Sequence, residues 1–235
     1  MSKIYKRILV ISDMHAPYGH ADTVAFLKAI KNKYNPDKII SIGDEIDAAS
    51  ISFHTHDPDL LSPSDEFSAA IKKLNPIYKL FPKMDILESN HGSLVYRRGK
   101  AFGLPRHVFK SYREVIQAPK DWNWHHDLIV DTPNGKVYFH HALSSSVLKS
   151  SQATGMNTVF GHHHQSFSIE YWTSGYQTKW AMFVGCLINL KSMAFDYGKN
   201  NLKKPIIGCG MIIDGHPKLM KMELNRKNRW IGKLI

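Results

Sequence analysis

The stretch RILVISDMH, from Arg7 to His15, is an apolar run followed at once by two side chains that can bind a metal ion, Asp13 and His15. Its Ile, Leu and Val residues are typical of a buried β-strand. Residues two apart on an extended chain point to the same side, so the carboxylate and the imidazole can reach toward one centre. The stretch therefore predicts a strand that carries functional groups at its carboxyl end.

The same arrangement recurs along the chain. In open α/β sheets, sites form outside the carboxyl ends of the strands, so five such ends are expected to meet at one edge. Burying so many polar groups at strand ends without partners would cost several kcal/mol of folding free energy. A pair of metal ions would act as partners for these groups. The four further strands and the residues that follow them are IISIG with Asp44, DILES with Asn90 and His91, VYF with His140 and His141, and TVFG with His162, His163 and His164.

The first ninety residues alternate between predicted strands and helices. Apolar β-rich runs begin at Arg7, Lys38 and Met84, and helical patterns cover residues 22–33 and 62–80 between them. The second helical pattern begins with Ser62 as the capping residue, Pro63 at the first helical position and the acid Asp65 in the first turn. Strands that alternate with helices imply right-handed crossovers and a mostly parallel sheet.

The second half of the chain is β-rich. Residues 128–141 form two β-rich runs around a Pro-Asn-Gly turn, which predicts a hairpin, and further strands follow to about Leu224. Interrupted helices are expected over 94–117 and one more helix near 145–153. The sheet should therefore become mixed or pair with a second sheet. No linker or repeat divides the chain, so a single domain over 1–235 is expected.

The chain is basic, with 31 Lys and Arg against 20 Asp and Glu and a formal net charge of +11. This excess favours phosphate-bearing partners. Six bases and no acid lie between Ser93 and Arg113, interleaved with four aromatic residues, and a second basic stretch runs from His216 to Ile235. Bases neutralise phosphates and aromatic faces stack on nucleobases, so these segments suit a nucleic acid; a solvated surface is the alternative.

Neither a membrane segment nor a disulfide framework is expected. The longest apolar runs, such as that from Trp180, are too short to span a bilayer, and the amino terminus lacks a signal peptide's features. A cytoplasmic protein with no membrane partner is the prediction. Cys186 and Cys209 lie in strand-like segments and are expected to be reduced core residues. Any metal ion must then be held by His, Asp and Asn.

Five motifs together resemble those of the calcineurin-like metallophosphoesterases, whose pattern runs DxH, GDxxD, GNH, a strand-end His and GHxH. The resemblance implies an α/β fold, a four-layer α/β/β/α sandwich with two mixed sheets, and a dinuclear metal site at their edge. It spans roughly two thirds of the chain. The matching segments are Asp13-Met14-His15, Gly43-Asp44-Glu45-Ile46-Asp47, Ser89-Asn90-His91-Gly92, His140-His141-Ala142 and Gly161-His162-His163-His164.

The resemblance also implies a ligand set. His141 is preferred to His140 as the strand-end ligand, because the family usually follows this ligand with a small residue, here Ala142. Nitrogen and oxygen ligands without a thiolate suit Mn, which we expect, or Fe, Zn, Co or Ni. One metal would take Asp13, His15 and His164, the other would take Asn90, His141 and His162, and Asp44 would bridge the two.

His91 and Asp47 resemble the acid that protonates the leaving oxygen and the carboxylate that orients it. Two metals about 4 Å apart lower the pKa of a bridging water, so that a hydroxide can attack phosphorus. In-line displacement needs an acid on the far side, and a carboxylate raises the proton affinity of an imidazole. Arg97 or Arg98 could clamp the phosphate, with plain surface positions as the alternative.

Three positions depart from the family pattern. Ser89 replaces the usual Gly, and Gly92 replaces the acid that usually follows the His. These two changes leave the geometry of the loop open. Ala48 stands where phosphoprotein phosphatases have an Arg, which weakens assignment to that branch.

These features together predict a dinuclear metal-dependent phosphoester hydrolase with an unknown oligomeric state. Nucleic-acid phosphodiesters, the substrates of a nuclease, are slightly favoured over phosphomonoesters or phosphoproteins. A non-catalytic nucleic-acid-binding module with the same fold is the alternative from another class. A purely structural metal site is less favoured, because such sites are usually closed cages of four ligands.

Overall fold

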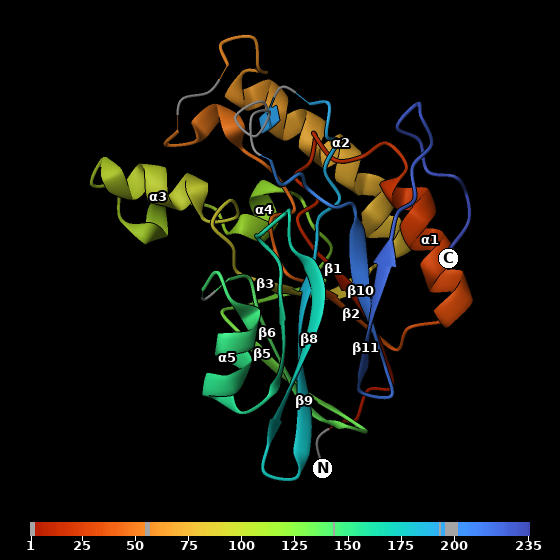
Figure 1. Cartoon of the computed structure of the whole chain (residues 1–235). Coiled ribbons are helices and arrows are strands. Elements are labelled where there is room, and N and C mark those ends of the chain that lie inside the picture. Colours follow the sequence, from red (N-terminus) through yellow and green to blue (C-terminus); the bar gives the residue numbers. More distant parts are fainter. Residues whose placement is uncertain (1–2, 55–56, 143, 193, 196–201) are drawn as a thin grey trace.

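The computed structural model describes residues 3–54, 57–142, 144–192, 194–195 and 202–235. Its strands form two sheets that lie face to face, with α1 and α2 on one side and α5 on the other (Figure 1). The first sheet has six strands in the order β11-β10-β1-β2-β3-β4, and the second has five in the order β5-β6-β7-β9-β8.

The strands are β1 (Arg7–Ile11), β2 (Lys38–Ser41), β3 (Lys83–Leu87), β4 (Asp121–His125), β5 (Leu128–Thr132), β6 (Gly135–His140), β7 (Asn157–Phe160), β8 (Phe167–Ser174), β9 (Gln177–Val184), β10 (Gly208–Ile213) and β11 (His216–Lys221). The helices are α1 (Thr23–Tyr34), α2 (Pro63–Leu80), α3 (Leu94–Ala101), α4 (Tyr112–Val115) and α5 (Val147–Thr154), with short 3-10 turns η1 (Ala49–Ile51) and η2 (Arg106–Val108).

Both sheets are mixed, as expected. In the first sheet β1 to β4 run parallel, while β10 is antiparallel to both β1 and β11. In the second sheet β6, β7 and β9 run parallel, and β5 and β8 flank them in the antiparallel direction. The parallel strands of each sheet end at one edge, which brings the loops that follow them together.

Side chains of β1 alternate between the two faces of the first sheet, because successive residues of a strand point to opposite sides. Leu9 and Ile11 pack with α1 and α2 in one core, whereas Ile8 and Val10 pack against the second sheet in another. The outer face of the second sheet forms a third, smaller core with Val147 of α5. The resulting order of helices, sheet, sheet and helix confirms the four-layer prediction.

Local sequence signals located most elements correctly. The helix start at Ser62 is confirmed, since its hydroxyl accepts the Asp65 backbone N–H at 3.3 Å. The hairpin of β5 and β6 is confirmed as well. Strand β4 was not predicted from the sequence. Asp and Asn are depleted from strands, and the run DWNWH becomes a strand by pairing with β3 at the edge of the sheet.

Both cysteines are buried and free, which confirms them as core residues. Burial raises the pKa of the Cys186 and Cys209 thiols. Among the described residues, no helix is both long and apolar enough to cross a membrane.

Candidate metal centre

Five loops, each following a strand, bring the predicted metal-competent residues together at the shared edge of the two sheets. Four of these residues have a positive φ, namely Asp13 (49°), His15 (45°), Asp44 (53°) and His162 (62°). Residues other than Gly adopt this conformation rarely, and such positions concentrate at functional sites. The turns that follow β1, β2 and β7 are therefore shaped to aim these side chains.

Asp13, His15 and His164 form the first cluster. The Nε2 atoms of the two imidazoles lie 3.1 Å apart, and His164 Nε2 lies 3.2 Å from Asp13 Oδ1. His15 Nε2 lies 3.7 Å from the same carboxylate oxygen. The three residues meet the geometric criterion for holding one ion, since one potential ligand atom from each lies within 4.8 Å of the others.

Asp44, His141 and His162 form the second cluster, with Asn90 beside it. His141 Nε2 lies 3.3 Å from Asp44 Oδ2, 3.2 Å from His162 Nδ1 and 2.7 Å from Asn90 Oδ1. The amide oxygen of Asn90 thus faces the same point as the imidazoles. This second group also meets the criterion for holding one ion.

Asp44 lies between the two clusters. Its Oδ2 atom is 3.3 Å from His141 Nε2 in the second cluster and 3.6 Å from His15 Nε2 in the first. The backbone N–H of His162 donates to Asp13 Oδ2 at 2.9 Å, which links the loops of the two clusters. A carboxylate in this position can neutralise two neighbouring cations at once.

Hydrogen bonds on the far side of two imidazoles determine which nitrogen faces the centre. His15 Nδ1 lies 2.5 Å from Asp47 Oδ1, and His141 Nδ1 donates to the Ile42 carbonyl at 2.8 Å. In the neutral rings each Nε2 therefore carries a lone pair, and it faces carboxylate, amide and imidazole acceptors. Lone pairs that converge in this way fit divalent cations, and metal-binding imidazoles are held by such outer contacts.

The electrostatics of the buried residues favour ionised carboxylates. Burial opposes ionisation of Asp13, but hydrogen bonds from His15 and His164 outweigh it and hold the pKa of the carboxyl well below its usual range. Burial also opposes the charge on His141, but the nearby Asp44 carboxylate raises its pKa to about 9. His162 is partly exposed; desolvation of the remaining ring and repulsion from His141 lower its pKa to about 4.

His91 and Asp47 contact each other in a way that differs from the expectation. The backbone carbonyl of Asp47 accepts the hydrogen bond from His91 Nδ1. The Asp47 carboxylate lies 3.7 Å from that nitrogen and engages His15 instead. The backbone N–H of His91 donates to Asp44 Oδ1 at 3.1 Å, so the ring is held against both clusters. His15, Asp44 and His91 also form a third group that could hold an ion.

Histidines that are adjacent in the sequence face different surroundings in the structure. His141 faces the second cluster, whereas His140 turns toward His126, with the ring centroids 5.4 Å apart. His163 points away from both clusters and lies 3.3 Å from the Ser144 carbonyl. The structure therefore brings His141 to the site and leaves His140 and His163 outside the clusters.

The two candidate arginines have different surroundings. Arg98 donates to the carbonyls of Ile51 and Ser52, and its guanidinium lies over the Phe53 ring. Arg97 is exposed, makes a long hydrogen bond of 3.4 Å to the Asn90 carbonyl, has its guanidinium 5.2 Å from the centre of the same Phe53 ring, and lines the hollow that contains His141. Only Arg97 thus has its guanidinium both close to the clusters and largely free.

Two serines that the sequence did not identify as functional support the carboxylates. Ser12 donates to Asp13 Oδ2, and Ser89 accepts the backbone N–H groups of Asp44 and Gly92 at 3.0 and 3.2 Å. A Cβ at position 92 would lie 3.1 Å from the Ser89 hydroxyl and 3.2 Å from the Tyr112 ring, so the usual acid would require these neighbours to shift by a few tenths of an ångström. The feature of the sequence that marked Ser89 was that it replaces the Gly usual at this position of the family motif.

Glu66 of α2 is a buried carboxylate that holds the loop after Asp47. Its oxygens accept the backbone N–H groups of Ala49 and Ser50, both at 2.8 Å. Glu66→Ala leaves both donors without an acceptor, so we expect the free energy of unfolding to fall by about 2–4 kcal/mol in urea denaturation. The control Glu170→Ala, at an exposed position of β8, should change it by less than about 0.5 kcal/mol. Equal stability of the two variants would contradict the role of Glu66.

Comparison with known proteins adds one family and several similar structures. The calcineurin-like phosphoesterase family matches residues 6–82, which contain the first two motifs. No curated protein sequence matches the chain. An archaeal phosphodiesterase has 15% identity and a TM-score of 0.49, covering 92% of this chain and 99% of its own. Vps29 of Chaetomium thermophilum has 10% identity and a TM-score of 0.49, and the match covers 98% of this chain and 93% of Vps29. YfcE, a phosphoesterase from E. coli, has 11% identity and a TM-score of 0.47, and the match covers 97% of this chain and 98% of YfcE.

Proposed function

We propose that this chain, whose residues 6–82 match the calcineurin-like phosphoesterase family, hydrolyses phosphoesters with two divalent metal ions. The observation that carries the proposal is the position of Asp44, whose single oxygen Oδ2 lies 3.6 Å from His15 and 3.3 Å from His141. Two neighbouring cations repel each other, and a shared carboxylate offsets that repulsion.

The proposed ligands follow the two clusters. Asp44 serves both ions, and the donor atoms are carboxylate, amide and imidazole, which suit Mn first and Fe, Zn, Co or Ni as alternatives. When bound, two such ions supply a hydroxide near neutral pH and neutralise phosphoryl oxygens. The ligands are Asp13, His15 and His164 for one ion and Asn90, His141 and His162 for the other.

The side chains around the clusters have their own proposed roles. His91 donates a proton to the leaving oxygen, because its ring lies beside both clusters and its Nδ1 is occupied by the Asp47 carbonyl. Asp47 positions this ring through that carbonyl and positions His15 through its carboxylate. Arg97 binds the phosphate, because it lines the hollow with His141 and His162 and its hydrogen bond to the Asn90 carbonyl is long; Arg98 donates to backbone carbonyls instead.

Nucleic-acid phosphodiesters are the substrates that we favour slightly. The basic, aromatic-rich segment of residues 93–113 follows His91 directly, and a nucleic-acid backbone would complement its charge. Phosphomonoesters and phosphoproteins are the alternative substrates. We further propose that the chain forms one domain, since β1 of the first sheet and β6 of the second share a buried core.

The experiment that tests this function is a metal-dependent substrate panel. Purified protein is freed of metal, reloaded with Mn, and assayed on 4-nitrophenyl phosphate, bis(4-nitrophenyl) phosphate, a phosphopeptide, and single-stranded and duplex DNA. We expect hydrolysis of the diesters with Mn, and loss of at least about 100-fold in rate with chelator, because the hydroxide would no longer form.

The panel also separates the alternatives. Preferred turnover of 4-nitrophenyl phosphate or the phosphopeptide would replace the nuclease assignment by a phosphatase one. Salt-dependent DNA binding without turnover of any ester would support the non-catalytic binding module. Absence of both metal binding and turnover would overturn the proposed function.

A further inference from the structure

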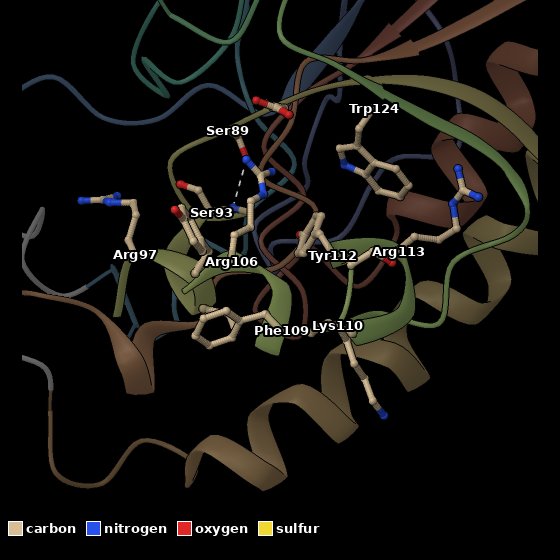
Figure 2. Close-up of a pocket in the computed structure, with 15 residues that line it drawn as sticks. Ser89, Ser93, Arg97, Arg106, Phe109, Lys110, Tyr112, Arg113 and Trp124 are labelled. Carbon is tan, nitrogen blue, oxygen red and sulfur yellow. Dashed lines mark hydrogen bonds between the residues drawn. The ribbon is translucent and has the colours of Figure 1, made fainter. Parts of the chain in front are cut away.

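A cavity of about 890 Å³ lies beside the candidate metal centre (Figure 2). The loop after β3, helix α3, the segment 106–115 and Trp124 of β4 enclose it. Glu88, Ser89, Ser93 and Arg97 line both this cavity and the smaller hollow that contains His141 and His162. The two spaces therefore adjoin each other, and a ligand whose phosphate lies at the metal centre could reach the larger one past these side chains.

The charged side chains that line the cavity are mostly positive. Four cationic side chains and one carboxylate line it. Within the described part of the chain, no carboxylate forms an ion pair with Arg106 or Lys110, and both residues are exposed. Unpaired cations around a concave surface attract phosphate groups. The cations are Arg97, Arg106, Lys110 and Arg113, and the carboxylate is Glu88.

Two buried donors of the cavity wall have no acceptor among the described residues. They are the indole Nε1 of Trp124 and the guanidinium Nε of Arg113. Figure 2 shows the Trp124 indole nitrogen on the side of the ring turned toward Ser89 and Arg106, with the Arg113 guanidinium on the opposite side of the ring. Buried donors normally find a partner, so this pair calls for oxygen or nitrogen acceptors from a ligand.

The cavity also presents flat aromatic and guanidinium surfaces. The guanidinium of Arg106 lies over the Tyr96 ring at 5.2 Å, and the rings of Tyr112 and Trp124 are 5.6 Å apart. Unstacked nucleobases bind to aromatic rings and guanidinium planes, whereas the base faces of a duplex are already covered. The combination of these surfaces with cations favours a single strand.

Packing behind the cavity holds its walls in place. The Phe109 ring lies so close to Gly99 of α3 that a Cβ there would approach its Cζ to 1.9 Å. On the far side, Ser111 and Glu114 form a capping box at the start of α4. A preformed wall lowers the entropy lost when a ligand binds.

We propose that this cavity is the subsite for the nucleotide next to the scissile phosphate of a single-stranded nucleic acid. Arg106 and Lys110 bind the adjoining backbone phosphates, and Trp124 and Arg113 donate to the base or sugar. Its volume falls within the usual range for small-ligand sites. The inference rests on the proposed function for the identity of the scissile bond, but binding in the cavity does not require turnover.

The first test measures binding without catalysis. Fluorescein-labelled oligothymidylate is titrated with the full chain in chelator, and anisotropy gives the Kd. Arg106→Ala/Lys110→Ala should weaken binding by about 10-fold or more, because phosphate contacts dominate affinity. The matched control Lys72→Ala/Lys100→Ala removes the same charge from exposed positions outside the cavity and should change the Kd by less than about twofold. Equal weakening by both pairs would overturn the subsite, as would tighter binding of a phosphopeptide than of oligothymidylate.

The second test uses two esters with the same leaving group. With Mn, the cavity variant should raise KM for the 5′-(4-nitrophenyl) ester of thymidine 3′,5′-bisphosphate, whose 3′-phosphate represents the adjoining backbone phosphate, by about 10-fold and leave KM for bis(4-nitrophenyl) phosphate within about twofold. Equal KM changes for the two esters would overturn the subsite. If the unsubstituted protein turns over neither ester but still binds oligothymidylate through Arg106 and Lys110, the proposed function fails while the subsite is supported.

Discussion

Asp44→Asn should abolish phosphoester hydrolysis, with kcat lowered by about 1000-fold or more. Among the described residues, Asp44 Oδ2 is the carboxylate oxygen that lies within 4 Å of imidazoles from both clusters, and Asp44 Oδ1 accepts the His91 backbone N–H. An amide is neutral and would leave the repulsion between two cations uncompensated. A loss of several kcal/mol of charge stabilisation corresponds to a rate effect of this size.

Metal analysis shows whether this loss has the proposed cause. Asp44→Asn should bind fewer than two Mn ions per chain in calorimetric titration, while its circular dichroism spectrum stays that of the unsubstituted protein. Asp59→Asn, an exposed Asp outside the clusters, should keep both ions and full activity. Two tightly bound ions and near-normal rates in Asp44→Asn would exclude its role as a shared ligand.

His91→Ala should lower turnover by about 100-fold or more while the metal content remains unchanged. This is the expected cost of removing a general acid. The effect should be large for DNA, whose leaving alkoxide needs a proton. It should be much smaller for bis(4-nitrophenyl) phosphate, whose leaving group is stable as an anion. The ratio of the two effects is the measurement that identifies proton donation.

Two outcomes would contradict the acid role of His91. Loss of metal together with activity would make it a ligand, as its place in the third cluster with His15 and Asp44 allows. Equal losses on the two substrates would make its contribution independent of the leaving group. His216→Ala, at an exposed position of β11, is the control and should match the unsubstituted protein.

The elements most accurately predicted were those with strong local signals. The apolar run of β1, the capped start of α2 and the Pro-Asn-Gly hairpin lie where the sequence placed them. Strand β4 shows the limit of this approach. Its two tryptophans alternate with polar residues too briefly to give a clear pattern, and it is a strand because β3 provides backbone partners on one side.

The candidate site was likewise predicted from the sequence in part. The sequence identified the metal-competent residues, because each follows an apolar run that is easy to recognise. It preferred His141 to His140 only through the family resemblance, and it did not distinguish Arg97 from Arg98. The side chain of His141 reaches the site whereas that of His140 turns toward His126. Arg98 donates to two backbone carbonyls, whereas Arg97 makes one long hydrogen bond of 3.4 Å to the Asn90 carbonyl. The Asp47 carboxylate lies 3.7 Å from His91 Nδ1, the contact that the sequence predicted, but it also lies 2.5 Å from His15 Nδ1, which the sequence did not predict.

The sequence by itself determined the order of the strands and helices other than β4 and the residues that gather at the sheet edge, and its resemblance to a known family implied the four-layer class of the fold. Periodicity and strand-end residues are local properties, so a linear chain displays them. The tertiary structure alone decided how Asp44 lies between the two clusters and how residues 88–124 enclose a basic cavity beside them. These features depend on distances between side chains far apart in sequence, which the packing of two sheets and the loops between them sets.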